Sequence, residues 1–190
     1  MAIEHNSTYH VSTEEIIDIC KRQGRAFEGS AEFASTGNDI FKTVFTTGEN
    51  PVILYSRKIS FSENGVNAYL YRNPTYTGGT AAEVNNPNDI NPQDPTASIV
   101  VGATVTDDGI LSRAPVYVFG NDSNQGNGSV LQVIDNPQHL PPNSEFLLVI
   151  ESRDEAAQEI ASVIEWCEPE RIPGLSIVDG SFVRYSGKLL

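Results

Sequence analysis

The stretch VTDDGIL, residues 105–111, places two adjacent acids directly before a glycine. Paired carboxylates can hold a divalent cation or serve as general acid and base. The same residues suit a strand reversal, because a type I′ turn needs positive φ at both central positions, which Gly109 accepts freely and Asp108 tolerates. No second acidic cluster supports Asp107 and Asp108 as ligands or catalysts. We therefore predict a turn of the scaffold at this point, preceded by the alternating apolar residues Val101, Ala103 and Val105.

The other residue types that carry out chemistry are scattered along the chain. Histidines stand at positions 5, 10 and 139, whereas a zinc site needs clustered histidine, cysteine or carboxylate ligands. No G-x-S-x-G motif is present, and no serine or cysteine is coupled locally to a histidine. A distant pair of carboxylates, of the kind that glycosidases use, cannot be recognised among 25 acids. We therefore predict no enzyme, and no catalytic, cofactor-binding or metal-ligating residue.

Two polar segments are the places where a small ligand would be sought. Residues 73–98 are rich in Pro, Asn and Gly, and a segment of this length is typical of a binding loop or a surface excursion. Residues 121–129 are a second polar loop. A solvated loop is the preferred interpretation of both, because the spacing of an EF-hand is absent, and binding of calcium or of a host glycan stays open. The residues that suggest calcium are Asp89, Asn91 and Asp94 in the first segment and Asp122, Asn124 and Gly126 in the second.

Three tyrosines approach the longer polar segment: Tyr69, Tyr71 and Tyr76. Exposed aromatic rings could stack on sugars, which would make this region the surface of a carbohydrate-binding module. Strand tyrosines more often bury half of the ring and hydrogen-bond the hydroxyl. The second interpretation is preferred.

The charge of the chain excludes several classes of partner. The formal net charge is −13 and the sequence pI is about 4.5, which disfavours nucleic acids and anionic membranes. No apolar run approaches the ~20 residues that span a bilayer.

The N-terminus lacks the basic start and apolar stretch of a secretory signal, so we expect synthesis in a cytoplasm. In that compartment Cys20 and Cys167 are expected to be free thiols rather than a disulfide.

Residues 12–24 predict a short amphipathic helix. Ser12 and Glu15 have the spacing of a capping box, and Gly24 ends the segment. A helix of this length is not stable alone in water, so its apolar stripe must pack either on its own domain or on a neighbouring chain. Both alternatives stay open. The stripe, taken as a candidate partner contact, consists of Ile16, Ile17, Ile19 and Cys20.

From about residue 31 the pattern changes to short alternating strands separated by turns. Residues 53–61 and 66–70 predict two strands of a meander joined by an Asn-Gly turn. In the first strand one face is apolar with period two, interrupted by Arg57, and consists of Ile53, Tyr55, Ile59 and Phe61. Some eight strands with little helix indicate an all-β fold, namely a β-sandwich, for which a jelly roll is one candidate topology. We expect an N-terminal helix-bearing arm (1–30), a sandwich domain (31–170) and a C-terminal tail (171–190). The tail carries further candidate partner contacts at Leu175, Ile177, Phe182 and Tyr185.

The order of several segments resembles a group of small virion proteins of tailed bacteriophages. These segments are STGNDIFKTVFTTGENPVILYSRKISF, AYLYRNPTYTGG, GATVTDDG, HLPPNSEFLLVIES and IEWCEP. The resemblance covers about residues 33–168, and its motifs are structural. This chain departs from the group in having Cys167 where an aromatic residue commonly precedes the last acid, and in its long ends.

The resemblance implies a β-sandwich protein of the virion, of the type that decorates and cements the capsid. Its partner would be the major capsid protein, on whose outer lattice it would sit, and a homo-oligomer, a trimer by analogy, is implied. Extended ends that become ordered on binding would suit this role. The alternatives are a tail, adaptor or fibre-anchoring component of the virion, or the carbohydrate-binding module considered above.

Overall fold

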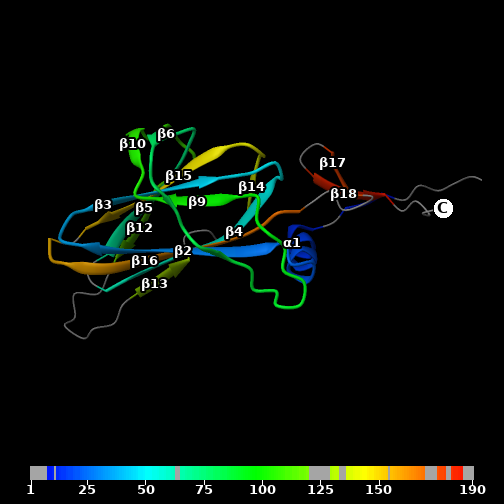
Figure 1. Cartoon of the computed structure of the whole chain (residues 1–190), viewed down its shortest axis with the longest axis horizontal. Helices are drawn as coiled ribbons and strands as arrows, with labels where there is room; N and C mark the ends of the chain where they lie inside the picture. Colours follow the sequence, from blue (N-terminus) through cyan, green and yellow to red (C-terminus); the bar gives the residue numbers. More distant parts are fainter. Residues whose placement is uncertain are drawn as a thin grey trace, which may run out of the picture.

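Two antiparallel β-sheets packed face to face form a β-sandwich in the computed structural model of the chain (Figure 1). The structure describes residues 8–10, 12–62, 65–119, 129–132, 136–153, 155–169, 175–178 and 181–185. For 8–10, 118–119, 129–132, 175–178 and 181–185 the description covers the backbone alone. The all-β sandwich expected from the sequence is confirmed.

The first sheet, called sheet I, has β15 at its centre. Its spatial order is β11 (Ile110–Leu111), β5 (Gly65–Arg72), β15 (Glu145–Ser152), β3 (Ile40–Thr46), β9 (Ser98–Val101) and β7 (Thr80–Ala81), with β12 (Val116–Phe119) also paired to β5. The second sheet, sheet II, is centred on β16. Its order is β13 (Ser129–Gln132), β4 (Val52–Phe61), β16 (Gln158–Cys167), β2 (Ala26–Ser35) and β8 (Val84–Asn85), with β14 (Gln138–Leu140) also paired to β4.

Consecutive long strands lie in opposite sheets, so the expected meander is wrong. β4 and β5 do not pair with each other: β4 pairs with β16, and β5 pairs with β15. The chain therefore passes from sheet II to sheet I between Ser62 and Gly65, and Gly65 has a φ of +126°. Each of these strands therefore pairs with a strand from a distant part of the chain.

A β-bulge in β4 corrects the predicted faces of that strand. The register against β16 shifts between Glu165 and Trp166. Before the shift Leu54 points into the sandwich, where it packs in the cluster of Trp166, whereas Ile53 points outward. After the shift Ile59 points inward. The sequence pattern put Ile53 and Ile59 on one face, because period-two counting does not see an extra residue.

Helix α1 (Thr13–Arg22) packs on the outer face of sheet II. Ser12 and Glu15 form the predicted capping box. Ile16 and Cys20 are fully buried, in a cluster with Ile53 and Cys167 of sheet II. Packing on its own domain is therefore the alternative that the structure adopts. β2 also begins at Ala26, so the sandwich starts inside the segment expected to be an arm.

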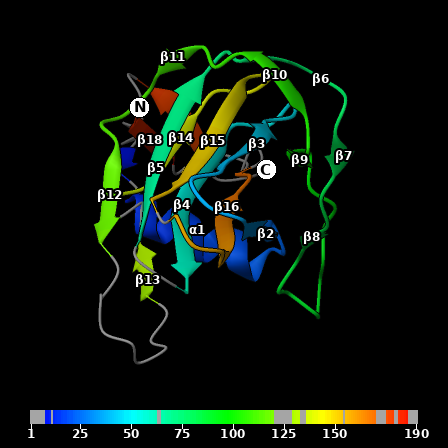
Figure 2. The same ribbon diagram turned by 90° about the vertical axis from the view of Figure 1, so that its left-hand side faces the viewer.

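The long polar segment is an ordered strap across one edge of the sandwich. After the short strand β6 (Thr75–Thr77), β7 pairs with β9 at the edge of sheet I, and β8 pairs with β2 at the edge of sheet II (Figure 2). Glu168, which follows β16, fixes the end of the strap, because its buried carboxylate accepts hydrogen bonds from the backbone amides of Thr96 and Ala97. The segment is thus part of the scaffold rather than a free excursion.

The two ends of the chain pair with each other. β1 (Thr8–His10), β18 (Ser181–Tyr185) and β17 (Leu175–Val178) form a three-stranded antiparallel sheet in the order β1-β18-β17, called the end sheet. It lies beyond α1 at one end of the molecule (Figure 1). The expected separate arm and tail therefore share one element. Within the described residues, no helix has the length and hydrophobicity required to cross a membrane.

Candidate functional site

The predicted partner contacts do not form one surface. Ile16, Ile17 and Cys20 are buried against sheet II, and Ile19 is half-buried. The expectation that this stripe contacts a partner is therefore corrected for the three buried residues. The side chains of the tail contacts, Leu175, Ile177, Phe182 and Tyr185, lie outside the described residues, and only their strand pairing is defined.

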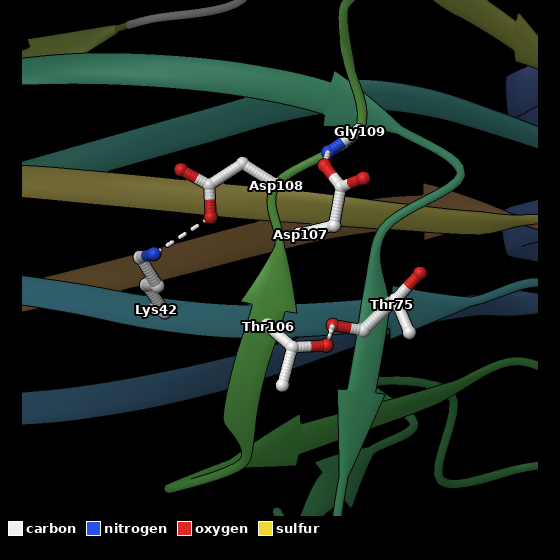
Figure 3. Close-up of polar contacts among 6 residues, drawn as sticks. All are labelled: Lys42, Thr75, Thr106, Asp107, Asp108 and Gly109. Carbon is white, nitrogen blue, oxygen red and sulfur yellow. Dashed lines mark hydrogen bonds and ion pairs between the residues drawn. The ribbon is translucent and has the colours of Figure 1, made fainter.

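The stretch VTDDGIL joins two separate strand pairs rather than two strands of one hairpin. β10 (Thr104–Asp107) pairs with β6, whereas β11 pairs with β5. Gly109 has the predicted positive φ, +82°, but Asp108 does not, so the predicted type I′ turn is wrong. A register shift at Thr106 precedes the step, and its hydroxyl donates to the carbonyl of Thr75 at 3.2 Å (Figure 3).

Both acids of this stretch have structural partners. Asp108 Oδ1 lies 2.6 Å from Lys42 Nζ, and Asp107 Oδ1 accepts a hydrogen bond of 2.9 Å from the backbone amide of Gly109 (Figure 3). A Cβ at Gly109 would lie 2.3 Å from the carbonyl oxygen of Arg72. The stretch is therefore part of the scaffold, as predicted, but it links two strand pairs and does not form a type I′ turn.

The calcium hypothesis finds no support among the described residues. No group of three His, Cys, Asp or Glu side chains there could hold a metal ion. Asn91 serves the scaffold instead: its amide donates to the carbonyl of Gln23 at 3.4 Å and its Oδ1 accepts from Gln93. The second candidate loop, with Asp122, Asn124 and Gly126, lies outside the described residues.

Tyr69 and Tyr71 lie on β5 at the outer face of sheet I, whereas Tyr76 belongs to β6 of the β6–β10 pair that packs against this face. Their rings pack against a small buried cluster formed by Val44, Leu147 and Val149. The hydroxyl of Tyr69 donates to Glu151 at 2.9 Å and that of Tyr76 to Glu145 at 3.3 Å. Burial and the bond to Glu151 raise the pKa of the Tyr69 hydroxyl. This matches half-buried strand tyrosines better than a free platform for sugars.

Arg57 is the residue that most needs a functional explanation. It lies just beyond the bulge of β4, and this shift turns its side chain into the sandwich. The side chain is 2% exposed. Nη1 donates to the carbonyl of Tyr69 at 3.2 Å, whereas Nε and Nη2 are buried without a hydrogen-bond partner. Burial lowers the pKa of the Arg57 guanidinium to about 10, so it stays charged at neutral pH.

A cavity of about 290 Å³ faces Arg57 at the edge of sheet I. Its outer wall comes from residues 113–115. These belong to the segment 112–115 between β11 and β12, whose four residues lie opposite only Tyr69 and Leu70 of β5, because Leu111 pairs with Tyr71 and Val116 with Ala68. The extra residues loop out of the ladder, as in a β-bulge. The residues lining the cavity are Arg57, Ala68, Tyr69, Leu70, Arg113, Ala114, Pro115, Val116, Asn136 and Leu148.

The lining of this cavity is cationic and apolar. Its described lining residues include two arginines and no acid, in a chain whose acids outnumber its Lys and Arg by 25 to 12. Arg113 also borders a neighbouring hollow of about 490 Å³, lined in addition by Arg72 and His139. Burial lowers the pKa of His139. The sequence signal for this site was Arg57, which interrupts the period-two apolar pattern of this strand, but its meaning depended on the bulge.

Cys20 and Cys167 are both free and buried, as expected for reduced thiols. They lie together between α1 and sheet II. A hydrogen bond with Cys20, together with burial, raises the pKa of the Cys167 thiol. The pair therefore has the character of packing residues, since the reactive form of cysteine is the thiolate.

Comparisons with known proteins leave the chain without an assigned family. No family model matches the sequence, and no curated protein is similar to it. One solved structure, of T=1 particles derived from infectious bursal virus, is 11% identical over 85% of this chain and 43% of the other, with a TM-score of 0.18. The match thus spans less than half of that viral chain, and at this TM-score it carries no argument about fold or function.

Proposed function

We propose that the chain is a structural protein of a bacteriophage virion that binds the outer surface of the major capsid protein lattice and stabilises the head. The observation that carries this proposal is the end sheet: both chain ends join in one small sheet beyond α1, apart from the sandwich core. Such an element suits attachment to a partner. The sequence resemblance to decoration proteins supplies the identity of that partner.

The strand order supports a jelly-roll topology for the sandwich. Taking the eight principal strands in chain order as β2, β3, β4, β5, β12, β13, β15 and β16, sheet II has the spatial order first, eighth, third, sixth. Sheet I has the order second, seventh, fourth, fifth. Two interleaved Greek keys produce this arrangement, which is common among viral capsid and lectin domains.

The end sheet offers a physical mode of attachment. β1 and β17 are its outer strands, and each has one edge without a partner among the described residues. An open edge can add a strand from another protein, whose backbone then completes the hydrogen bonds. The acidic composition of the chain keeps separate copies in solution until they reach the capsid.

Truncation tests this attachment directly. Because α1 is part of the core, the informative deletions are residues 1–11 and residues 171–190, and not the whole segment before the sandwich. Recombinant chain would be added to purified capsids that lack it, and binding would be read by co-sedimentation and by capsid heat resistance. We expect each deletion to abolish binding while the sandwich keeps its melting temperature. Full binding by both truncated chains would overturn the role of the end sheet.

Copy number distinguishes the head from other virion stations. A decoration protein would be present in a fixed ratio to the major capsid protein, whereas a tail, adaptor or fibre-anchoring component would match a single ring. Quantitative mass spectrometry of purified particles measures this ratio. Absence of the chain from particles would refute the virion role altogether. Light scattering of the free chain tests the trimer that analogy suggests.

A further inference from the structure

The buried guanidinium of Arg57 has an unsatisfied edge. A guanidinium carries five N–H donors, and taking it out of water is costly unless they find acceptors. Among the described residues, only Nη1 of the Arg57 nitrogens has an acceptor, the carbonyl of Tyr69. Nε and Nη2, the two without one, form the side of the guanidinium that binds a carboxylate through two parallel hydrogen bonds.

The cavity beside Arg57 completes an anion site. Its volume of about 290 Å³ is close to the lower limit of known ligand pockets, and it equals the space of about ten waters at ~30 Å³ each. A ligand of roughly ten non-hydrogen atoms would fill it. Inside, Ala68, Leu70 and Leu148 offer apolar contact, while Asn136 and Arg113 stand among the lining residues as further donors.

We propose that this cavity binds a small organic carboxylate with an apolar body. The carboxylate accepts two hydrogen bonds from Nε and Nη2 of Arg57, and the apolar part lies along the inner face of β5 and β15. Arg113 stands at the exposed side of the cavity, where its Nε lies 2.7 Å from the side-chain oxygen of Gln138 when that amide is turned toward it. There it adds to the positive potential that attracts the ligand. This inference does not depend on the capsid role.

The chemistry of the lining explains the choice of ligand class. A neutral apolar molecule would leave the buried charge unpaired, which favours an anion in a low-dielectric site. An inorganic ion would leave the apolar wall in contact with water. A single carboxylate on an apolar body satisfies both parts of the cavity.

Isothermal titration with octanoate and benzoate tests the proposal, with octanol and benzyl alcohol as neutral counterparts and inorganic phosphate as the ion without an apolar body. We expect the acids to bind the wild-type chain at least tenfold more tightly than the alcohols or phosphate. Arg57→Met should remove this preference. Lys58→Met is the matched control, since Lys58 is the next residue of β4 and its ammonium pairs outside the cavity with Glu165 at 3.0 Å.

Two further variants keep the test decisive should Arg57→Met fail to fold. Arg57→Lys keeps the charge but not the planar fork, and we expect it to lose at least threefold in affinity for both acids. Arg113→Gln, at the exposed side, should weaken binding about twofold to fivefold without unfolding. Equal binding of acids and alcohols by the wild-type chain would overturn the proposal. So would the absence of binding by any probe, which would mean that the cavity holds water alone.

Discussion

Replacing Glu168 with alanine should destabilise the chain by about 4 kcal/mol, because one buried carboxylate accepts hydrogen bonds from both the strap and β16. Glu168 is 1% exposed. Its Oε1 accepts from the Ala97 amide at 2.9 Å and from Trp166 Nε1 at 3.2 Å, and its Oε2 accepts from the Thr96 hydroxyl at 2.6 Å. These donors belong to the strap and to β16.

The magnitude follows from the donors that the substitution leaves behind. The Ala97 amide and the Trp166 indole N–H are buried, and each unsatisfied buried donor costs about 1–3 kcal/mol. Thr96 is exposed and can turn to water, so it adds little. The empty volume of the side chain adds a smaller cavity cost. Together these effects give roughly 3–5 kcal/mol, which is a large share of the stability of a typical domain.

Urea unfolding, followed by tryptophan fluorescence, measures the loss as a shift in midpoint at constant slope. Glu159→Ala is the matched control, because Glu159 lies on β16, the strand that Glu168 follows, and is exposed. We expect that control to stay within about 0.5 kcal/mol of the wild type. Limited proteolysis should also cleave the Glu168→Ala strap within residues 82–97 sooner than in the control.

A loss below 1 kcal/mol for Glu168→Ala would refute this reasoning, since it would mean that the two buried donors find other acceptors. A large loss without faster cleavage of the strap would show that the effect comes from the Trp166 side alone. Glu168→Gln separates these cases further. It keeps one carbonyl oxygen, so we expect a smaller loss of about 1–3 kcal/mol.

Four other predictions concern the remaining features. Gly109→Ala should cost about 2 kcal/mol or more in urea unfolding, because φ is +82° and the added Cβ would lie 2.3 Å from the Arg72 carbonyl oxygen; an unchanged midpoint would contradict this. Ile16→Ala should lower the free energy of unfolding of the isolated chain by about 2–5 kcal/mol. If Ile16 instead contacted only a partner, the same substitution would leave the stability of the isolated chain almost unchanged. Cys20 and Cys167 should react with a thiol reagent at pH 8 only on unfolding, since burial and their mutual hydrogen bond raise the pKa of Cys167; rapid labelling of the native chain would refute this. Hydrogen bonds from Thr36 lower the pKa of Asp39 below its ordinary 3.8. The ionised Asp39 therefore stabilises the folded chain fully above that value, and this contribution is lost as the pH falls through the lowered pKa. Asp39→Asn should flatten this part of the acid-unfolding curve, and an unchanged curve would exclude the effect.

Local patterns were sufficient to predict the helix and the class of fold. Ser12 and Glu15 are three residues apart, which determines a capping box wherever the helix packs. The alternation of apolar residues similarly determined that strands form. Strand partners could not be predicted in the same way, since β4 finds β16 and β5 finds β15 about 80 to 110 residues away. The sequence between β4 and β5 carries no signal that identifies either partner strand.

The candidate site shows the same division. The sequence alone determined that Arg57 stands in an apolar strand, that Gly109 needs a positive φ, and that the chain carries a formal net charge of −13. Only the tertiary structure decided that a bulge turns Arg57 inward, that residues 112–115 leave a cavity beside it, and that both chain ends meet in one sheet. The physical reason is that a one-residue shift exchanges the two faces of a strand, and such a shift is set by the long-range partner and not by the strand's own residues.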